Sequence, residues 1–174
     1  KAADELITMS NKVGISTTEL QKMQYASRFV DVEVETMTDS MFKLTKTMND
    51  ANTGTKRSQE AFKRLGVAYK TEVTGELLDS KQVWADAIDA LGKIGNETER
   101  DALAMDIFGR SAKELNPLIV AGGDSLKKYG DEAEKLGVIM GEDQVAALGR
   151  FDDSMQQLQA SLEGAKNKIA VALL

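Results

Sequence analysis

The chain has 174 residues, of which 42% are hydrophobic, 29% charged and only 5% aromatic, and its formal net charge is −6. Its length suits one domain, or one domain with an extension, and an acidic chain without a concentrated basic patch is a poor candidate for binding nucleic acid or an anionic membrane. The sequence contains no Cys and no His, which removes thiolate chemistry, cysteine metal sites, the commonest general base and the commonest metal ligand.

The first predicted element is a helix over residues 2–12, and Val13-Gly14 ends it because Gly tolerates the left-handed turn that follows a helix. Ser16-Thr-Thr-Glu19 has the pattern of a capping box and opens the next helix. The single proline, Pro117, leaves room for long helices, and apolar content dominated by Ala, Leu and Met favours packing of helix on helix.

A stripe of mostly apolar residues spaced by three and four runs from Leu20 to Met48, which is the helical pattern. Within it, Val30-Asp-Val-Glu-Val34 alternates with period two, as a strand would. We interpret this conflict as a short break near residues 30–33 between two helices, because a lone strand has no obvious partner nearby. A loop over Asp50–Gly54 and a helix over about 55–65 follow.

Residues 67–78 lack helical spacing and predict a small β-hairpin or an extended loop. Asp79 then resembles a helix N-cap. The apolar face of that helix runs from Val83 to Leu91, and Gly92 or Gly95 ends it.

Two more capping boxes are predicted, Asn96-Glu-Thr-Glu99 and Ser111-Ala-Lys-Glu114, each opening a helix. Pro117 predicts a kink or a restart, because it disfavours helical geometry at the residue before it. After Gly122-Gly123, Asp124 is predicted to cap a further helix.

The last helix is predicted to begin near Glu142 and to run to the end of the sequence. Its apolar residues are spaced strictly by three and four over about three heptads, as in a coiled-coil seam. These residues are Leu148, Phe151, Met155, Leu158, Leu162, Ala165, Ile169 and Ala172. Flanking positions such as Asp152, Gln159 and Lys166 are polar. A seam this regular is expected to be buried against another helix, including helices of other copies of the chain.

We therefore predict an all-α fold: a compact multi-helix bundle over residues 1–141, with the small hairpin near 67–78, and a long heptad-type helix over 142–174. Both ends of the sequence look like cuts through a longer protein, because Lys1 is not a start methionine and the last residues are apolar.

Three groups of acidic residues are the candidates for catalysis or metal binding. A glycosidase needs two carboxylates facing each other across a cleft. The densest cluster lies in and after a predicted helix N-terminus, where acids favourably meet the helix dipole, and this structural reading is preferred. It comprises Glu97, Glu99, Asp101 and Asp106. Two further groups lack the spacing of a calcium loop and are read as solvated faces. They are Asp152 with Asp153, and Asp31 with Glu33 and Glu35.

Other patterns are also interpreted structurally, and no cofactor is predicted. The basic cluster of Lys56, Arg57, Lys63 and Arg64 reads as a solvated helix face. Phe108-Gly-Arg-Ser and Ala121-Gly-Gly-Asp precede helices and could bind an anion, but neither has a full phosphate-loop pattern. The methionines at helical spacing, namely Met23, Met37, Met41 and Met48, are more often core than an adaptable binding surface.

Three stretches carry an extended resemblance to a known family. The first comprises Ala2-Ala-Asp-Glu-Leu6, Gly14-Ile-Ser-Thr-Thr-Glu-Leu20, Gln21-Lys-Met-Gln-Tyr-Ala26 and Val32-Glu-Val-Glu-Thr-Met37. The second is Ala61-Phe-Lys-Arg-Leu-Gly-Val67 with the stretch up to Asp79. The third comprises Trp84-Ala-Asp-Ala-Ile-Asp-Ala-Leu91, Glu97-Thr-Glu-Arg-Asp-Ala-Leu-Ala-Met-Asp-Ile-Phe-Gly109 and Arg110-Ser-Ala-Lys-Glu-Leu-Asn-Pro-Leu118. On these residues the chain resembles tape measure proteins of long-tailed bacteriophages and their prophages.

The resemblance implies a structural role and no catalysis. Tape measure proteins occupy the tail lumen, set tail length by their own length, and are present in the host cytoplasm during assembly. They contact the tail tube protein, tail assembly chaperones and tail-tip proteins. The resemblance includes no short catalytic motif, so no functional residue is carried across, and it implies no specific nucleic acid and no small-molecule substrate. This chain would be a compact region of such a protein, because Gly breaks and caps fold it back on itself.

The sequence is also compatible with two other functions. A helical adaptor or effector module would present a hydrophobic groove for a partner helix. A cell-wall hydrolase fragment would show lysis that depends on Glu99 or Asp101.

Overall fold

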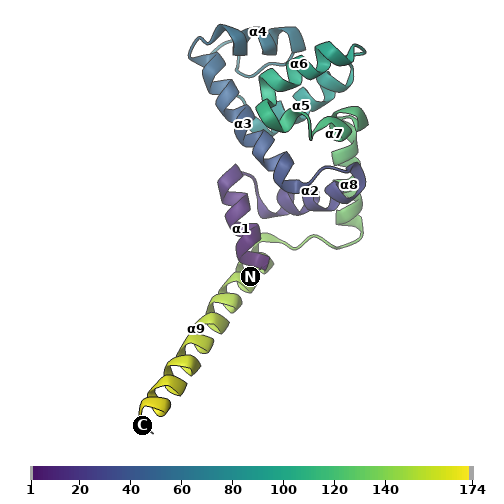
Figure 1. Cartoon of the computed structure of the whole chain (residues 1–174). Helices are drawn as coiled ribbons and strands as arrows, with labels where there is room; N and C mark the ends of the chain where they lie inside the picture. Colours follow the sequence, from purple (N-terminus) through teal and green to yellow (C-terminus); the bar gives the residue numbers. More distant parts are fainter. Residues whose placement is uncertain (1, 173–174) are drawn as a thin grey trace. The chain divides into compact units, whose positions relative to one another are not determined.

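The computed structural model describes residues 2–172, and the side chains of the last helix up to Lys166 (Figure 1). The fold is all-α, as predicted. The chain divides into two compact units. Residues 21–139 form the central unit, and the described residues before and after them form the terminal unit. The expected compact region of residues 1–141 is thus not kept together in this division, because residues 2–20 group with the last helix.

The central unit begins within α2 and contains the six α-helices and one 3₁₀-helix that follow it. These elements are α2 (Thr17–Val30), α3 (Val34–Asn52), α4 (Lys56–Leu65), α5 (Ser80–Gly92), α6 (Glu97–Phe108), η1 (Gly109–Ala112), α7 (Asn116–Ala121) and α8 (Gly123–Lys135). α3 packs against α4, α5, α6 and η1, while α5 packs against α7 and α8 (Figure 1).

The predicted break between two helices near residues 30–33 is confirmed. α2 ends at Val30, and α3 begins at Val34. Asp31 adopts a left-handed conformation with φ of 54°, which Asp tolerates better than most residues because its short polar side chain bonds locally. Val30 and Val32 are both buried, whereas Asp31 and Glu33 are exposed. The period-two pattern therefore marks a turn that buries its two valines, and not a strand.

The methionines predicted to belong to the core do so. Met23, Met37, Met41 and Met48 are all buried. The last three lie on the inner face of α3, one or two turns apart, where flexible side chains fill the space between α3 and its neighbours. A buried Thr47 hydroxyl donates to the backbone oxygen of Ile107 at 3.0 Å and ties α3 to α6.

A close backbone contact joins α5 to α7. A Cβ atom placed on Gly92 would lie 2.6 Å from the backbone oxygen of Ile119. Only glycine fits there without moving backbone, so this residue sets how closely the two helices approach.

Residues 67–78, predicted as a small β-hairpin or an extended loop, form a loop with one antiparallel bridge between Lys70 and Leu77, and residues 2–172 contain no strand. The Thr71 amide donates to the Glu76 oxygen at 2.8 Å and closes the turn. Val73 at the tip is 96% exposed. The base of the loop packs on α4 through Tyr69 and Phe62, whose ring centroids are 4.7 Å apart, but no third strand in the described residues supports the exposed tip, and the ladder ends after one bridge.

Three predicted helix caps are confirmed. Backbone N–H groups donate to the Ser16 hydroxyl (3.1 Å), to the Asp79 carboxylate (3.0 Å) and to the Asn96 side-chain oxygen (3.0 Å). In each case the capping residue satisfies an amide that has no partner inside its helix.

Two predicted helix starts are wrong. Ser111 opens no α-helix, because it lies inside η1, and the next helix begins instead at Asn116. Pro117 stands in the first turn of that helix, where its missing N–H leaves no bond unmade. Asp124 is not a cap either. It lies in the first turn of α8, and Gly122 holds the N-cap position.

The terminal unit contains α1 (Ala2–Val13) and α9 (Glu142–Ala172), together with the first turn of α2. The helix predicted over residues 2–12 is confirmed as α1, and the predicted start of the last helix near Glu142 is confirmed as the start of α9. Over the part of the chain described, none of the helices is both long enough and apolar enough to cross a membrane.

Candidate association surface

α1 covers one side of the start of α9. Val145 is 1% exposed, and Gly149, one turn further on, is also buried. A Cβ atom on Gly149 would lie 3.3 Å from Cδ1 of Ile7, so the absence of a side chain lets α1 lie close. From Arg150 to Lys166 the side chains of α9 are exposed, apart from a half-buried Asp152.

The predicted seam lies on a different side of α9 from the α1 contact, and over its described residues α1 leaves it exposed. Its first five residues are largely exposed: Leu148 45%, Phe151 61%, Met155 40%, Leu158 52% and Leu162 54%. Ala165 is exposed as well. The side chains of Ile169 and Ala172 lie outside the described residues. Scattered apolar residues on a surface are ordinary, but a continuous stripe of five large ones indicates a face that another molecule covers. Helix association through the seam remains a prediction.

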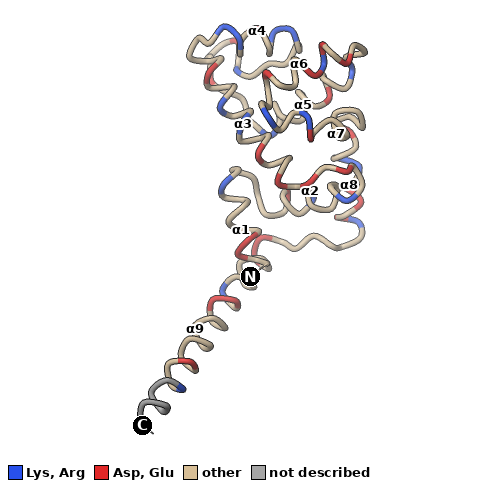
Figure 2. The backbone as a smooth tube through the Cα atoms, in the orientation of Figure 1, with Lys and Arg blue, Asp and Glu red and all other residues tan. Residues whose placement is uncertain are grey.

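Charged residues flank the seam on one side. In heptad terms Asp152, Gln159 and Lys166 occupy equivalent positions, each directly after a seam residue. The two ends of this flank carry opposite charge, Asp152 at one and Lys166 at the other. Over α9 as a whole, acidic and basic positions are interspersed (Figure 2).

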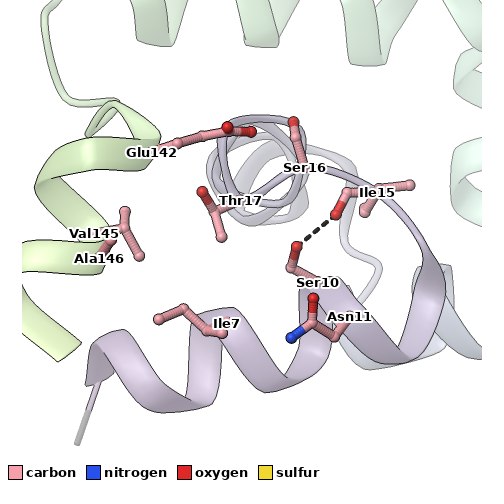
Figure 3. A pocket seen from close by; sticks show the side chains of 9 residues that line it. All are labelled: Ile7, Ser10, Asn11, Ile15, Ser16, Thr17, Glu142, Val145 and Ala146. Atoms are coloured by element: carbon pink, nitrogen blue, oxygen red, sulfur yellow. Dashed lines mark hydrogen bonds between the residues drawn. The ribbon is translucent and has the colours of Figure 1, made fainter. Parts of the chain in front are cut away.

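A shallow cavity of about 400 Å³ lies between α1, the start of α2 and the start of α9 (Figure 3). Ile7 and Val145 line one side of it, while Ser16 and the Glu142 carboxylate lie towards the other. The Ser10 hydroxyl donates to the backbone oxygen of Ile15 and so has its partner within the wall. The cavity offers a carboxylate and hydroxyls, but the structure holds nothing that identifies a ligand for it.

The acidic cluster of α6 forms ion pairs with the basic cluster of α4. Arg57 contacts Asp106 at 2.6 Å, and Arg64 contacts Glu99 at 3.0 Å. The structure thus brings the two clusters together as links between α4 and α6, and Glu97 and Glu99 stand in the first turn of α6, as the dipole argument expects. Asp101 contacts Arg100.

The other carboxylate groups form no metal centre within the described residues, where no group of three or more candidate ligands is close enough to hold an ion. Asp31, Glu33 and Glu35 are exposed around the helix break. Gly123 belongs to the candidate anion site Ala121-Gly-Gly-Asp and packs against Asp89 of α5. A Cβ atom placed on Gly123 would lie 3.2 Å from the Cβ atom of Asp89. A neighbouring carboxylate disfavours an anion there.

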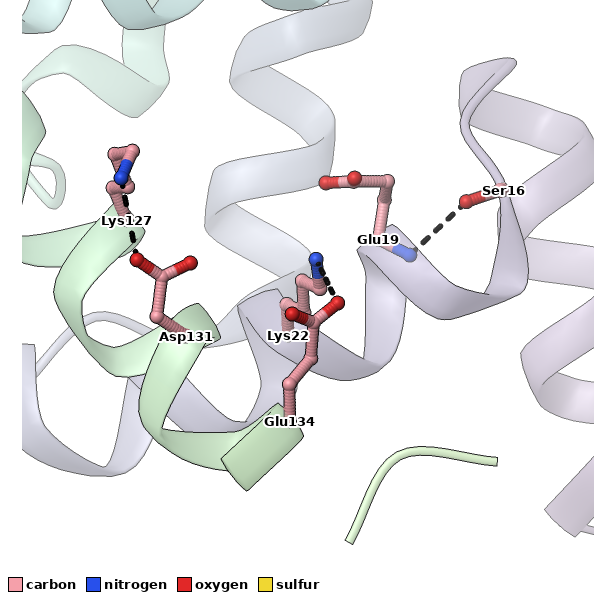
Figure 4. A network of polar contacts seen from close by, with 6 residues as sticks. All are labelled: Ser16, Glu19, Lys22, Lys127, Asp131 and Glu134. Atoms are coloured by element: carbon pink, nitrogen blue, oxygen red, sulfur yellow. Dashed lines mark hydrogen bonds and ion pairs between the residues drawn. The ribbon is translucent and has the colours of Figure 1, made fainter. Parts of the chain in front are cut away.

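Polar and aromatic contacts join α2 to α8 within the central unit. Lys22 pairs with Glu134 at 2.6 Å, and Lys127 pairs with Asp131 along α8 (Figure 4). The Tyr25 hydroxyl donates to the Glu132 carboxylate at 3.0 Å. Burial raises the pKa of the Tyr25 phenol, and the hydrogen bond to Glu132 and its negative charge raise it further.

At the end of α5, the hydrogen bond to Asp89 and the negative charge of Asp89 raise the pKa of the Lys93 ammonium.

Sequence reasoning missed the residues that dock α1 onto α9. Val145 and Gly149 stand one turn apart and off the seam. That spacing, with a glycine inside a helix, is the signal that could have revealed a second contact face.

Comparison of the chain with family models, curated proteins and solved structures finds no match.

Proposed function

We propose that this chain is a structural region of a phage tail tape measure protein, acting in tail assembly without catalysis. In this role the parent protein determines tail length in the tail lumen, after assembly in the host cytoplasm. Its partners are other copies of itself, the tail tube protein, tail assembly chaperones and tail-tip proteins. The extended resemblance over the first 118 residues supports the assignment.

The structural observation that carries the proposal is the uncovered seam of α9. Leu158 and Leu162 are each more than half exposed, although they stand at heptad core positions. Burying a large apolar side chain contributes about 1.5–3 kcal/mol. A helix of 31 residues that leaves such a stripe open is suited to association along its length, which an extended scaffold requires.

The test changes the length of α9 in the reading frame that encodes this chain. Four heptads inserted after Leu162 preserve the seam and lengthen a continuous helix by about 42 Å. We expect tails longer by about that amount in electron micrographs of the resulting particles.

The matched control inserts the same number of flexible Gly-Ser residues into the exposed loop at Val73, which lies in the compact central unit. That variant should leave tail length unchanged. Intact particles whose tails keep their original length after the heptad insertion would overturn the proposal, as would a reading frame that yields no particle-associated protein.

The same exposed seam also suits a helical adaptor that takes up a partner helix. If the chain is an adaptor, Leu158 and Leu162 should bind a helix of one different protein. Changing the length of α9 should then alter no dimension of a phage particle.

A further inference from the structure

We propose that two copies of this chain pair through the seam of α9 in antiparallel orientation, centred on the turn that contains Gln159 and Ala160. In this arrangement Met155 faces the partner's Ala165, and Leu158 faces the partner's Leu162. The inference is independent of the tail assignment, because any scaffold or adaptor with this helix would present the same face.

The sizes of the seam residues favour this orientation. Large residues, Phe151 and Met155, stand in the first half of the seam, and the small Ala165 stands in the second half. In a parallel pair each residue meets its own copy, so Phe would crowd Phe while Ala facing Ala would leave a void. Antiparallel pairing instead sets the large Met155 against the small Ala165 and leaves Leu158 against Leu162, so no layer has Phe on Phe or Ala on Ala. Close-packed interiors penalise both voids and overpacking, so even layers are more stable.

The flanking charges favour the same register. In an antiparallel pair, equivalent flanks of the two helices run side by side. Asp152 then lies beside the partner's Lys166, and symmetry repeats the pair at the other end. In a parallel pair the same two positions would instead face Ala147 and Ser161, which carry no charge. Flanking charges of this kind set orientation in paired helices.

The α1 contact leaves the seam open to a partner. α1 occupies the side of α9 that carries Val145 and Gly149, whereas Phe151 and Leu158 remain more than half exposed. Size, charge and exposure thus indicate the same occupant, a second copy.

Disulfide trapping distinguishes the two orientations directly, because the chain has no native Cys. Two single variants, Met155→Cys and Ala165→Cys, are prepared separately, one with a mass tag, mixed, and equilibrated in a glutathione redox buffer. Antiparallel pairing places these two positions opposite each other. It separates each from its own copy by about 15 Å, which is beyond disulfide reach of about 7 Å. The mixed disulfide should dominate.

A charge exchange tests the register with the seam intact. Asp152→Lys or Lys166→Asp alone should raise the dimer dissociation constant by roughly threefold to tenfold in low salt. The double variant should restore it. Gln156→Lys, outside both the seam and the charged flank, is the control and should leave the constant unchanged.

Sedimentation of the unmodified chain measures whether it forms dimers. If it does, but the Cys variants yield mainly the homodisulfide of each variant, the pair is parallel and the proposal is overturned. A chain that stays monomeric at high micromolar concentration and forms no disulfide would overturn it too. Neither result bears on tail length, so failure here is distinguishable from failure of the proposed function.

Discussion

The indole Nε1 of Trp84 donates a hydrogen bond of 2.7 Å to the hydroxyl of Ser40, and both residues are buried. The same hydroxyl donates to the backbone oxygen of Met37 at 2.6 Å. A serine on α3 thus satisfies the one polar atom of the chain's single tryptophan, on α5. The bond links two helices through residues that stand 44 positions apart in the sequence.

Ser40→Ala should destabilise the central unit by about 1–3 kcal/mol, because it leaves the buried indole N–H without an acceptor. Urea unfolding monitored by Trp84 fluorescence measures the change. Ser161→Ala is the matched control, since its hydroxyl bonds within an exposed turn, and it should change stability by less than about 0.5 kcal/mol. Equal midpoints for the two variants would contradict the assigned role of Ser40.

Gly92→Ala should also destabilise the central unit, by about 1–3 kcal/mol. The added methyl would meet the Ile119 backbone oxygen at 2.6 Å, and backbone cannot move aside as a flexible side chain can. Thermal unfolding followed by circular dichroism provides the measurement. Gly164→Ala makes the same chemical change where no neighbour lies within 4 Å, and it should raise helicity because Ala favours helix over Gly. A neutral Gly92→Ala would show that α5 and α7 can separate freely.

Asn96→Ala should cost about 1 kcal/mol, because the Glu99 amide loses its acceptor at the start of α6. Thr55→Ala is the comparison. Thr55 occupies the N-cap of α4 but makes no capping bond through its side chain, so its removal should cost a few tenths of a kcal/mol at most. Chemical denaturation of both variants in parallel tests the difference, and a larger cost at Thr55 would refute the capping assignment.

Leu158→Asp combined with Leu162→Asp should abolish self-association while leaving the monomer folded. Both leucines are more than half exposed in the single chain, so a charge there meets water in the monomer and an apolar interface in the oligomer. Light scattering coupled to size exclusion reports the change in mass. Gln156→Asp with Ala160→Asp places the same two charges off the seam and should preserve the oligomer. If the seam variant changed neither mass nor melting temperature, the association surface would be wrong.

Tyr25 should make stability fall at alkaline pH. Its folded-state pKa lies above the ordinary value of 10.0, so folding favours the protonated phenol. This contribution is complete below about pH 10 and is lost as pH rises through the raised pKa. Between pH 9 and pH 11 the urea midpoint of Tyr25→Phe should therefore fall less than that of the wild type. Glu132→Gln should bring the phenol's pKa back towards its ordinary value, as followed by tyrosinate absorbance. Identical pH dependence in all three proteins would contradict the contact.

Much of the fold could be predicted because its signals are local. The caps at Ser16, Asp79 and Asn96 satisfy amides within three residues of themselves, so their function does not depend on distant neighbours. The cap predicted at Ser111 failed because the same residue pattern lies within η1, packed against α3 and α6. For residues 67–78 the sequence left a hairpin and an extended loop open, since a strand needs a partner surface that local sequence does not supply.

The candidate association surface was likewise predicted only in part. The three-and-four spacing from Leu148 to Leu162 is a property of the sequence and defines one apolar face of a helix whatever surrounds it. Whether that face is covered depends on residues far away in the chain. Only the tertiary structure decided that α1 docks on Val145 and Gly149 and leaves the seam open, because this contact depends on the close fit of Ile7 over a glycine. Helix identity and amphipathic face follow from short-range periodicity, whereas the pairing of faces follows from shape, which exists only once the chain has folded.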